Sequence, residues 1–171
     1  MPPSNPLARM TRKTLCLPAG LRHWLLTRFF GRAVPFIATA GVDFQRVEAD
    51  CVEVRLRNRH KVQNHIKGVH AAATALLAET ASGFVMALNV PDDKLLLLKS
   101  MRVDYLQRSQ GNLRAQARLS PQQIELLHLE PKGNLLVAVL VSDDSDSAPV
   151  ACEMTWAWIS KQRRGEDHGQ S

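Results

Sequence analysis

One long apolar stretch, residues 64–90, most constrains the fold of this chain. Between Lys67 and Asp92 the only formally charged residue is Glu79, and seven of the intervening residues are alanine. Alanine is the best helix former, and a helix that is apolar on all sides is typical of a protein interior. The stretch therefore predicts a buried central helix that carries one carboxylate.

The same stretch is also long enough to cross a membrane, since a span needs about 20 mostly apolar residues. Against a span, a charge near the centre, where Glu79 lies, would cost about 2.5 to 3.5 kcal/mol in hydrocarbon. Thr74, Thr80 and Ser82 add further polar groups to the same segment. We therefore predict no transmembrane segment.

Glu79 is the first candidate for a functional residue, because carboxylates are rarely buried without a partner or a task. The alternative is a structural ion pair with an arginine. His70 lies nine residues before Glu79, and Asn64 lies six residues before His70. In a helix, nine steps of 100° and 1.5 Å put His70 and Glu79 on opposite sides, about 13.5 Å apart along the axis. A shared site would need a two-fold dimer, in which Asn64 and His70 of one subunit meet Glu79 of its partner.

Length and charge divide the chain into a basic arm and a neutral domain. The 171 residues are 45% hydrophobic but only 5% aromatic, which predicts one domain with an aliphatic core. Six basic residues precede the first acidic residue, Asp43, and the remaining 16 basic residues are balanced by 16 acidic ones. The net charge of +6 therefore belongs to the N-terminal part.

The cysteines indicate a reducing compartment. Cys16, Cys51 and Cys152 are odd in number and widely spaced, which argues against a disulfide framework or a zinc site and favours packing roles. No apolar signal followed by a cleavage site is visible at the start, so we expect a cytoplasmic protein. The arginine-rich, acid-free start is also typical of an organelle transit peptide, and that alternative stays open.

The pattern along the chain predicts an α+β fold. Residues 1–20 contain four prolines and no clear periodicity, so we expect an irregular segment that is mobile or draped over the surface. Residues 21–30 are expected to form a short basic amphipathic helix. Such a helix can lie on a membrane, contact nucleic acid, close the core or cover an acyl pocket. Strands are expected at 42–44, 52–56, 95–105, 113–119, 135–141 (fully buried) and 150–158, with a turn at 48–50 and a short capped helix at 121–129. Residues 161–171 form a polar, disordered tail.

These residues resemble the hotdog superfamily, and in particular its thioesterase-like branch. In that branch an asparagine begins a segment that contains a glycine and ends in His-Gly-Gly, and an acidic residue follows nine positions after the histidine. Asn64, His70 and Glu79 have the same spacings. The similarity extends over about residues 31–160, between the arm of 1–30 and the tail of 161–171. It implies a curved antiparallel sheet wrapped around one long central helix, and a homodimer or a dimer of dimers.

Three departures from the family pattern bear on activity. Gly68 lies one position later than the usual glycine, and Ala71 and Ala72 replace the Gly-Gly pair. The Ala71 N–H remains available for an oxyanion hole, although methyl groups limit how closely a carbonyl can approach. Leu98 occupies the position where some relatives have a serine or threonine, and Ser100 follows two residues later.

The resemblance implies acyl-CoA or acyl-carrier thioester hydrolysis without metal or other cofactor. Glu79 would activate water or attack directly, Ala71 would stabilise the oxyanion with its backbone N–H, and Asn64 would position water or thioester. His70 would bond backbone near the helix start or polarise the carbonyl. The acyl chain would lie in an apolar groove between subunits, and no nucleic acid is involved. The phosphates of coenzyme A would meet a basic group made of Arg57, Arg59, Lys61 and Lys67.

Two other functions stay open. Hotdog dehydratases have a histidine fourteen residues before a glutamate of the other subunit, and His65 and Glu79 have that spacing, although Ile66, Lys67 and Gly68 replace the usual Phe-Pro-Gly. A dimer that binds or senses acyl-CoA without hydrolysis is the other alternative, favoured by the alanine pair. A metal site of His65, His70 and Glu79 is not expected, because the spacing fits no common site.

Overall fold

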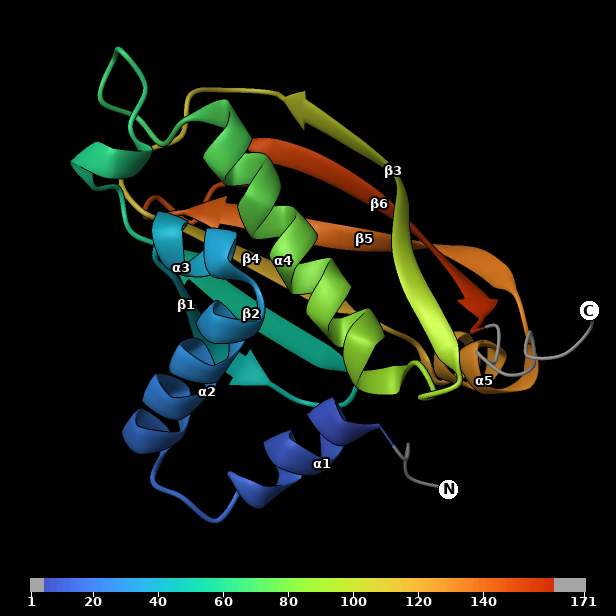
Figure 1. The fold of residues 1–171 in the computed structure, drawn as a ribbon. Helices are drawn as coiled ribbons and strands as arrows, with labels where there is room; N and C mark the ends of the chain where they lie inside the picture. The colour runs from blue at the N-terminus through green and yellow to red at the C-terminus, as the bar shows by residue number, and fades with distance from the viewer. Residues whose placement is uncertain (1–4, 162–171) are drawn as a thin grey trace, which may run out of the picture.

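The computed structural model describes residues 5–161, in which a six-stranded sheet curves around one long helix (Figure 1). The elements follow in the order α1 (Pro6–Lys13), α2 (Ala19–Ala33), α3 (Pro35–Ala40), β1 (Val42–Val47), β2 (Cys51–Leu56), the short 3-10 helix η1 (His60–Val62), α4 (Ala71–Asn89), β3 (Lys94–Tyr105), β4 (Leu113–Arg118), α5 (Pro121–Leu129), β5 (Gly133–Asp143) and β6 (Val150–Ser160).

The sheet is antiparallel throughout, with strand order β1-β2-β4-β5-β6-β3. α4 crosses its concave face (Figure 1) and contacts β2, β4, β5, β6 and β3 in turn. The predicted hotdog architecture, an α+β fold with a curved sheet around a central helix, is confirmed. Strands β1 and β3 are the edges of this sheet.

The central helix is a core element, as predicted. Leu77, Ala78, Ala81 and Val85 are fully buried against the sheet. α4 is long and apolar enough to cross a membrane, but 56% of its most apolar 18 residues lie buried within the molecule, so it is the core helix of the domain. It begins at Ala71, so the first part of the apolar stretch, residues 64–70, is loop.

One strand prediction was wrong in its burial. Residues 135–141 were expected to be fully buried, but β5 alternates, with Leu135, Val137 and Val139 buried and Leu136 and Leu140 exposed. The reason is that no layer of the described chain, residues 5–161, covers the convex face of the sheet, so every second side chain of β5 meets solvent.

The N-terminal region is more ordered than its prolines suggested. Residues 6–13 form α1, because Asn5 caps the helix by accepting from Leu7 N at 2.8 Å and Pro6 occupies the first helical position. The Asn5 Nδ2 also donates to the carbonyls of Ala87 and Val90, which ties α1 to the end of α4. The expectation of an irregular segment over 1–20 was therefore wrong for the described part.

Helix α2 is longer than the predicted 21–30 and packs by one face only. Phe30 is fully buried, with its ring centroid 4.6 Å from that of Phe44 and 4.5 Å from that of Phe84. Leu26 is buried on the same side. The predicted polar tail, apart from Lys161, lies outside the described residues.

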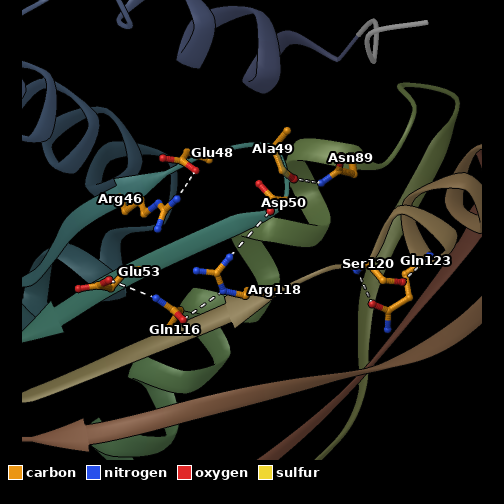
Figure 2. A network of polar contacts seen from close by, with 10 residues as sticks. All are labelled: Arg46, Glu48, Ala49, Asp50, Glu53, Asn89, Gln116, Arg118, Ser120 and Gln123. Carbon is orange, nitrogen blue, oxygen red and sulfur yellow. Dashed lines mark hydrogen bonds and ion pairs between the residues drawn. The ribbon is translucent and has the colours of Figure 1, made fainter. Parts of the chain in front are cut away.

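The capped helix at 121–129 is confirmed to its ends. Ser120 Oγ accepts from Gln123 N at 3.2 Å, and Gln123 Oε1 accepts from Ser120 N at 2.8 Å (Figure 2). This reciprocal pair satisfies two backbone donors at the start of α5, with Pro121 as the first helical residue. The sequence signal was sufficient here because all of its partners lie within four residues.

The end of α4 is anchored at the predicted turn 48–50. Asn89 Nδ2 donates to the carbonyl of Ala49 at 2.6 Å, and Arg118 of β4 lies 3.9 Å from the Asp50 carboxylate (Figure 2). The C-terminal end of the helix is thereby joined to the β1–β2 turn, and the candidate functional residues lie towards its other end and its middle.

Candidate functional site

Glu79 lies midway along α4, beside an apolar cavity of about 290 Å³. The cavity walls come from α1, the α2–α3 corner, α4 and β6, and include Leu7, Val34, Ile37, Phe84 and Trp156. Burial raises the pKa of Glu79 above its ordinary value. Among residues 5–161 the Glu79 carboxylate has neither an ion pair nor a hydrogen bond, so the structural ion pair considered from the sequence is not formed there.

Beside this carboxylate, α4 and β6 approach each other closely at Gly83, which has no side chain. A Cβ on Gly83 would lie 2.8 Å from two ring carbons of Trp156, and 3.7 Å from Glu79 Oε1. The indole of Trp156 is held in place because its Nε1 donates to Ser82 Oγ at 3.0 Å. Gly83 was not singled out from the sequence, although a position four residues after Glu79 lies on the same face of a helix.

Asn64 and Ala71 share a second cleft, of about 210 Å³, near the start of α4. The Asn64 Oδ1 accepts from Ile66 N and Gly68 N, both at 3.0 Å, so half of this amide holds the loop. Its Nδ2 has no hydrogen-bond partner among the described residues and is the half that remains for a ligand.

The first residue of α4, Ala71, lines this cleft. Its N–H lies at the positive end of the helix and has no partner within residues 5–161. Its carbonyl accepts from the hydroxyl of Tyr105 at 2.7 Å. A tyrosine hydroxyl is protonated at neutral pH and can donate this bond, and burial raises the pKa of Tyr105 further. Tyr105, the only tyrosine of the sequence, was read from the sequence only as a strand residue.

His70 is the N-cap of α4 and faces a third cleft. Its Nδ1 accepts from Ala72 N at 3.1 Å, so in the neutral ring the proton is on Nε2. The cleft, of about 220 Å³, also includes Lys61, Phe36 and Leu76. His70 is thus bonded to backbone at the helix start, and it lies in a different cleft from Asn64 and Ala71.

The four basic residues predicted to bind phosphate do not gather in one place. Lys67 lines a cleft of about 400 Å³ that adjoins the one of Asn64 and Ala71. Arg57 lies 3.4 Å from the Asp43 carboxylate, and Lys61 Nζ donates to a backbone carbonyl, that of Thr39, at 2.7 Å. Arg59 is exposed at the start of η1.

Arg108 is the cation that the sequence reading missed. It lines both the cleft of Asn64 and Ala71 and the cleft of Lys67, and its Nη2 donates to the Ile66 carbonyl at 3.2 Å. The residue is 41 positions away from Lys67 in the chain, in the loop after β3, so no local spacing indicated that the two would meet.

The residues required by the dehydratase and metal-site alternatives do not gather around Glu79. His65 is exposed in the loop before α4, and it lines neither the Glu79 cavity nor the cleft of Asn64 and Ala71. Within residues 5–161 no group of three or more His, Cys, Asp or Glu side chains is arranged to hold a metal ion.

Within one chain, the candidate residues therefore line four cavities or clefts, of which two adjoin each other. Ala71 and Glu79 are eight residues apart on α4, or about 12 Å along its axis. Asn64 and Ala71 line one cleft and Lys67 lines the adjoining one, whereas His70 and Glu79 each line a different cleft or cavity.

Comparisons with known proteins agree with this architecture. The model of a family described as a domain of unknown function, DUF4442, matches residues 22–159. None of the curated proteins matches the sequence at a significant level.

Solved structures are similar in fold at low sequence identity. A probable thioesterase of unknown function from Pseudomonas aeruginosa is 20% identical, with a TM-score of 0.74 over 85% of this chain and 97% of that one. A protein solved as a genomics target is 25% identical, with a TM-score of 0.72 over 91% and 99%. A thioesterase from Haemophilus influenzae is 14% identical, with a TM-score of 0.61 over 78% and 87%. The predicted resemblance to thioesterase-like hotdog proteins is confirmed.

Proposed function

Since this chain belongs to the DUF4442 family and has a thioesterase-like hotdog fold, we propose that it is a cytoplasmic hydrolase of acyl-CoA thioesters. One observation carries the proposal: the Glu79 carboxylate, without a charged partner among residues 5–161, faces an apolar cavity. An apolar cavity suits an acyl chain, and a carboxylate with a raised pKa is a stronger base towards water.

In the proposed reaction, Glu79 takes a proton from a water molecule, whose oxygen then forms a bond to the thioester carbonyl carbon. The carbonyl oxygen becomes an oxyanion that accepts from the Ala71 N–H, at the positive end of α4. When the tetrahedral intermediate collapses, the carbon–sulfur bond breaks and the thiolate receives the proton from Glu79. The products are a carboxylic acid and free thiol. Direct attack by Glu79, through an anhydride, is the variant of this step.

The proposal requires two subunits, because Glu79 and the Ala71 N–H lie in separate clefts of one chain. Strand β3 is a 12-residue edge with exposed apolar side chains at Leu95, Leu97 and Met101. Unpaired edges of this kind favour pairing with another chain. A two-fold dimer would bring Glu79 of one subunit to the α4 start of its partner.

The carrier of the thioester would be held next to this site. Lys67 and Arg108 line the cleft that adjoins Asn64 and Ala71, and cations there suit the phosphates of coenzyme A. Of the basic residues expected from the sequence, Lys67 keeps this role in the proposal, and Arg108 is added to it.

The test is hydrolysis of a panel of acyl-CoA thioesters, followed by the release of free thiol. We expect Glu79→Gln to lower kcat by about 10²- to 10⁴-fold, the usual contribution of a general base. Glu125→Gln, the same chemical change on the exposed side of α5, is the matched control and should keep the wild-type rate. A Glu79→Gln enzyme as active as the wild type would contradict the proposed mechanism.

Binding without hydrolysis is the second candidate, and one observation favours it. Ala71 and Ala72, both exposed, occupy the helix start where the family pattern has glycines, and the Ala71 methyl lies on the residue whose N–H would meet the carbonyl. If the wild type releases no thiol from any acyl-CoA but its Tm rises when acyl-CoA is added, the protein is a binding or sensing module.

A further inference from the structure

The outward face of α2 combines large apolar side chains with arginines. At 100° per residue, Trp24, Arg28, Phe29 and Arg32 all lie within about 80° of Leu21 around the helix axis. All five side chains are exposed, and Trp24 is 57% exposed. Exposed aromatic side chains grouped in this way mark interaction surfaces more often than isolated apolar residues do.

These residues are not needed to hold α2 on the domain. The opposite side of the helix supplies its anchors, Leu26 and Phe30, and both are buried. The exposed face could therefore have been polar without loss of core packing. Packing within residues 5–161 therefore does not account for the apolar side chains on this face, and a partner that covers them would.

The charged side chains of this face are all positive. Residues 5–42 contain no aspartate or glutamate, and neither Arg28 nor Arg32 forms an ion pair with any residue between 5 and 161. The Arg28 guanidinium carbon lies 5.8 Å from the centroid of the Trp24 ring, so charge and aromatic surface occur side by side. A partner for this face should be apolar and anionic.

Two more exposed apolar side chains follow α2 in the chain, and each lines a cleft or cavity. Val34 and Phe36, at the α2–α3 corner, are exposed, Phe36 by 62%. Val34 also lines the Glu79 cavity, and Phe36 lines the cleft of His70. We call Leu21, Trp24, Arg28, Phe29, Arg32, Val34 and Phe36 together the α2–α3 face, and through Val34 this face includes part of the wall of the Glu79 cavity.

We propose that the α2–α3 face docks on the surface of an anionic lipid bilayer. Trp24, Phe29 and Phe36 would enter the boundary between headgroups and acyl chains, while Arg28 and Arg32 contact lipid phosphates. Aromatic and aliphatic side chains together with arginines on an unpartnered helix face are the features of helices that lie in the membrane interface. Nucleic acid would use the arginines but would leave Leu21, Phe29 and Phe36 in water.

Docking of this kind is independent of the proposed hydrolysis, because none of the side chains that would contact lipid takes part in the proposed chemistry. Where both proposals hold, acyl chains could reach the Glu79 cavity from the lipid phase past Val34, which lines the cavity. The two proposals fail separately, since vesicle binding is measured without any thioester.

The test is co-sedimentation of the full chain with vesicles of phosphatidylcholine alone or mixed with phosphatidylserine. We expect binding to the mixed vesicles only, weakened about 30-fold or more by Arg28→Glu with Arg32→Glu, since each basic residue near an anionic surface strengthens binding several-fold. The control variant, Arg114→Glu with Lys132→Glu, changes the net charge equally at two exposed positions elsewhere. It should bind within about twofold of the wild type, because these positions lie outside the docking face.

Tryptophan fluorescence supplies a readout that is specific to this face. Trp156 and Trp158 are buried, so a blue shift on adding vesicles would report on Trp24. Trp24→Phe should still sediment with the mixed vesicles but lose the shift. An unchanged Tm for the Arg28→Glu, Arg32→Glu variant would show that its loss of binding is not a loss of fold.

Three results would overturn the proposal. One is that the wild type binds neutral and anionic vesicles equally well, or that it binds neither kind of vesicle. Another is a wild-type dimer that Trp24→Ser with Phe29→Ser converts to monomer in analytical ultracentrifugation, because a second copy then covers the face. The third is a DNA duplex that binds in dependence on Arg28 and Arg32 while vesicles do not bind.

Discussion

At the scale of single residues, Glu79 links the proposed chemistry to stability. Its pKa is raised in the folded protein because the apolar cavity disfavours the charged carboxylate. The neutral form therefore contributes stability below the ordinary pKa of 4.5, and this contribution is lost as the pH rises through the folded-state pKa. Above that pH, the charged side chain weakens the fold.

We therefore predict that Glu79→Gln raises the Tm at pH 8 and that the gain shrinks as the pH falls towards 4. The glutamine amide is uncharged at every pH, so its burial does not depend on pH, whereas the buried carboxyl group of the wild type becomes neutral only in acid. Calorimetric scans across this pH range check the prediction, with Glu125→Gln as the control. A gain that is independent of pH would show that desolvation of Glu79 is not the cause.

The residues at the start of α4 show how far spacing alone can lead. The steps from Asn64 to His70 and from His70 to Glu79 indicated the family and were sufficient to name the candidates. They could not show that the Asn64 Oδ1 is occupied by two loop amides, or that His70 turns to the cleft of Lys61. Those outcomes depend on the loop conformation before the helix, which includes a positive φ of 61° at Lys67.

At the scale of elements, the contact between α4 and β6 depends on the absence of a side chain at Gly83. We predict that Gly83→Ala destabilises the protein by about 1–2 kcal/mol, because overpacking against Trp156 outweighs the gain in helix propensity of about 1 kcal/mol. Gly20→Ala is the matched control: this glycine is also helical, in α2, but no atom lies within 4 Å of the Cβ position.

Urea denaturation of both variants measures the two free energies of unfolding. Gly20→Ala should be neutral or stabilise the protein by up to about 1 kcal/mol. If Gly83→Ala and Gly20→Ala had the same free energy of unfolding, the close approach of Trp156 to α4 would not penalise a side chain at position 83, and the prediction would be wrong.

Most elements were predictable because their signals are local. The alanine-rich run of α4 and the Ser120–Gln123 box of α5 each depend on hydrogen bonds and side chains within a few residues. Helix α1 was missed although Asn5-Pro6 is a helix-start signal, because four prolines over residues 1–20 suggested an irregular segment. Its docking on α4 spans 82 residues of chain, which no local pattern reveals.

At the scale of the whole molecule, the proposed site exists only if two chains share it. We predict that Glu79→Gln and Asn64→Asp, each inactive alone, restore activity when co-expressed. A heterodimer has one site with both wild-type residues, and random pairing makes half of all dimers heterodimers, so about a quarter of the wild-type rate is expected. Asn64→Asp keeps an oxygen that can accept from Ile66 N and Gly68 N, and it replaces the free amide donor by a charged carboxylate oxygen.

The comparison is the rate of thiol release from co-expressed and from separately purified variants, with sedimentation to establish the dimer. Recovery in the co-expressed sample alone would support a site formed between subunits. If dimers form but activity does not recover, each site uses Glu79 and Asn64 of the same chain, and the proposal of a site shared between subunits is contradicted.

The sequence by itself determined the six strands, the helices α2, α4 and α5, that α4 is the core, and that Glu79 is its one carboxylate. Those properties follow from helix propensity, side-chain periodicity and the cost of burying charge, all of which act locally. Only the tertiary structure decided which residues share a cleft, because Arg108 reaches the cleft of Lys67 from the loop after β3 and Val34 closes the Glu79 cavity from the α2–α3 corner. Such contacts depend on packing between segments that are far apart in the chain, so they cannot be predicted from the spacing of residues along the sequence.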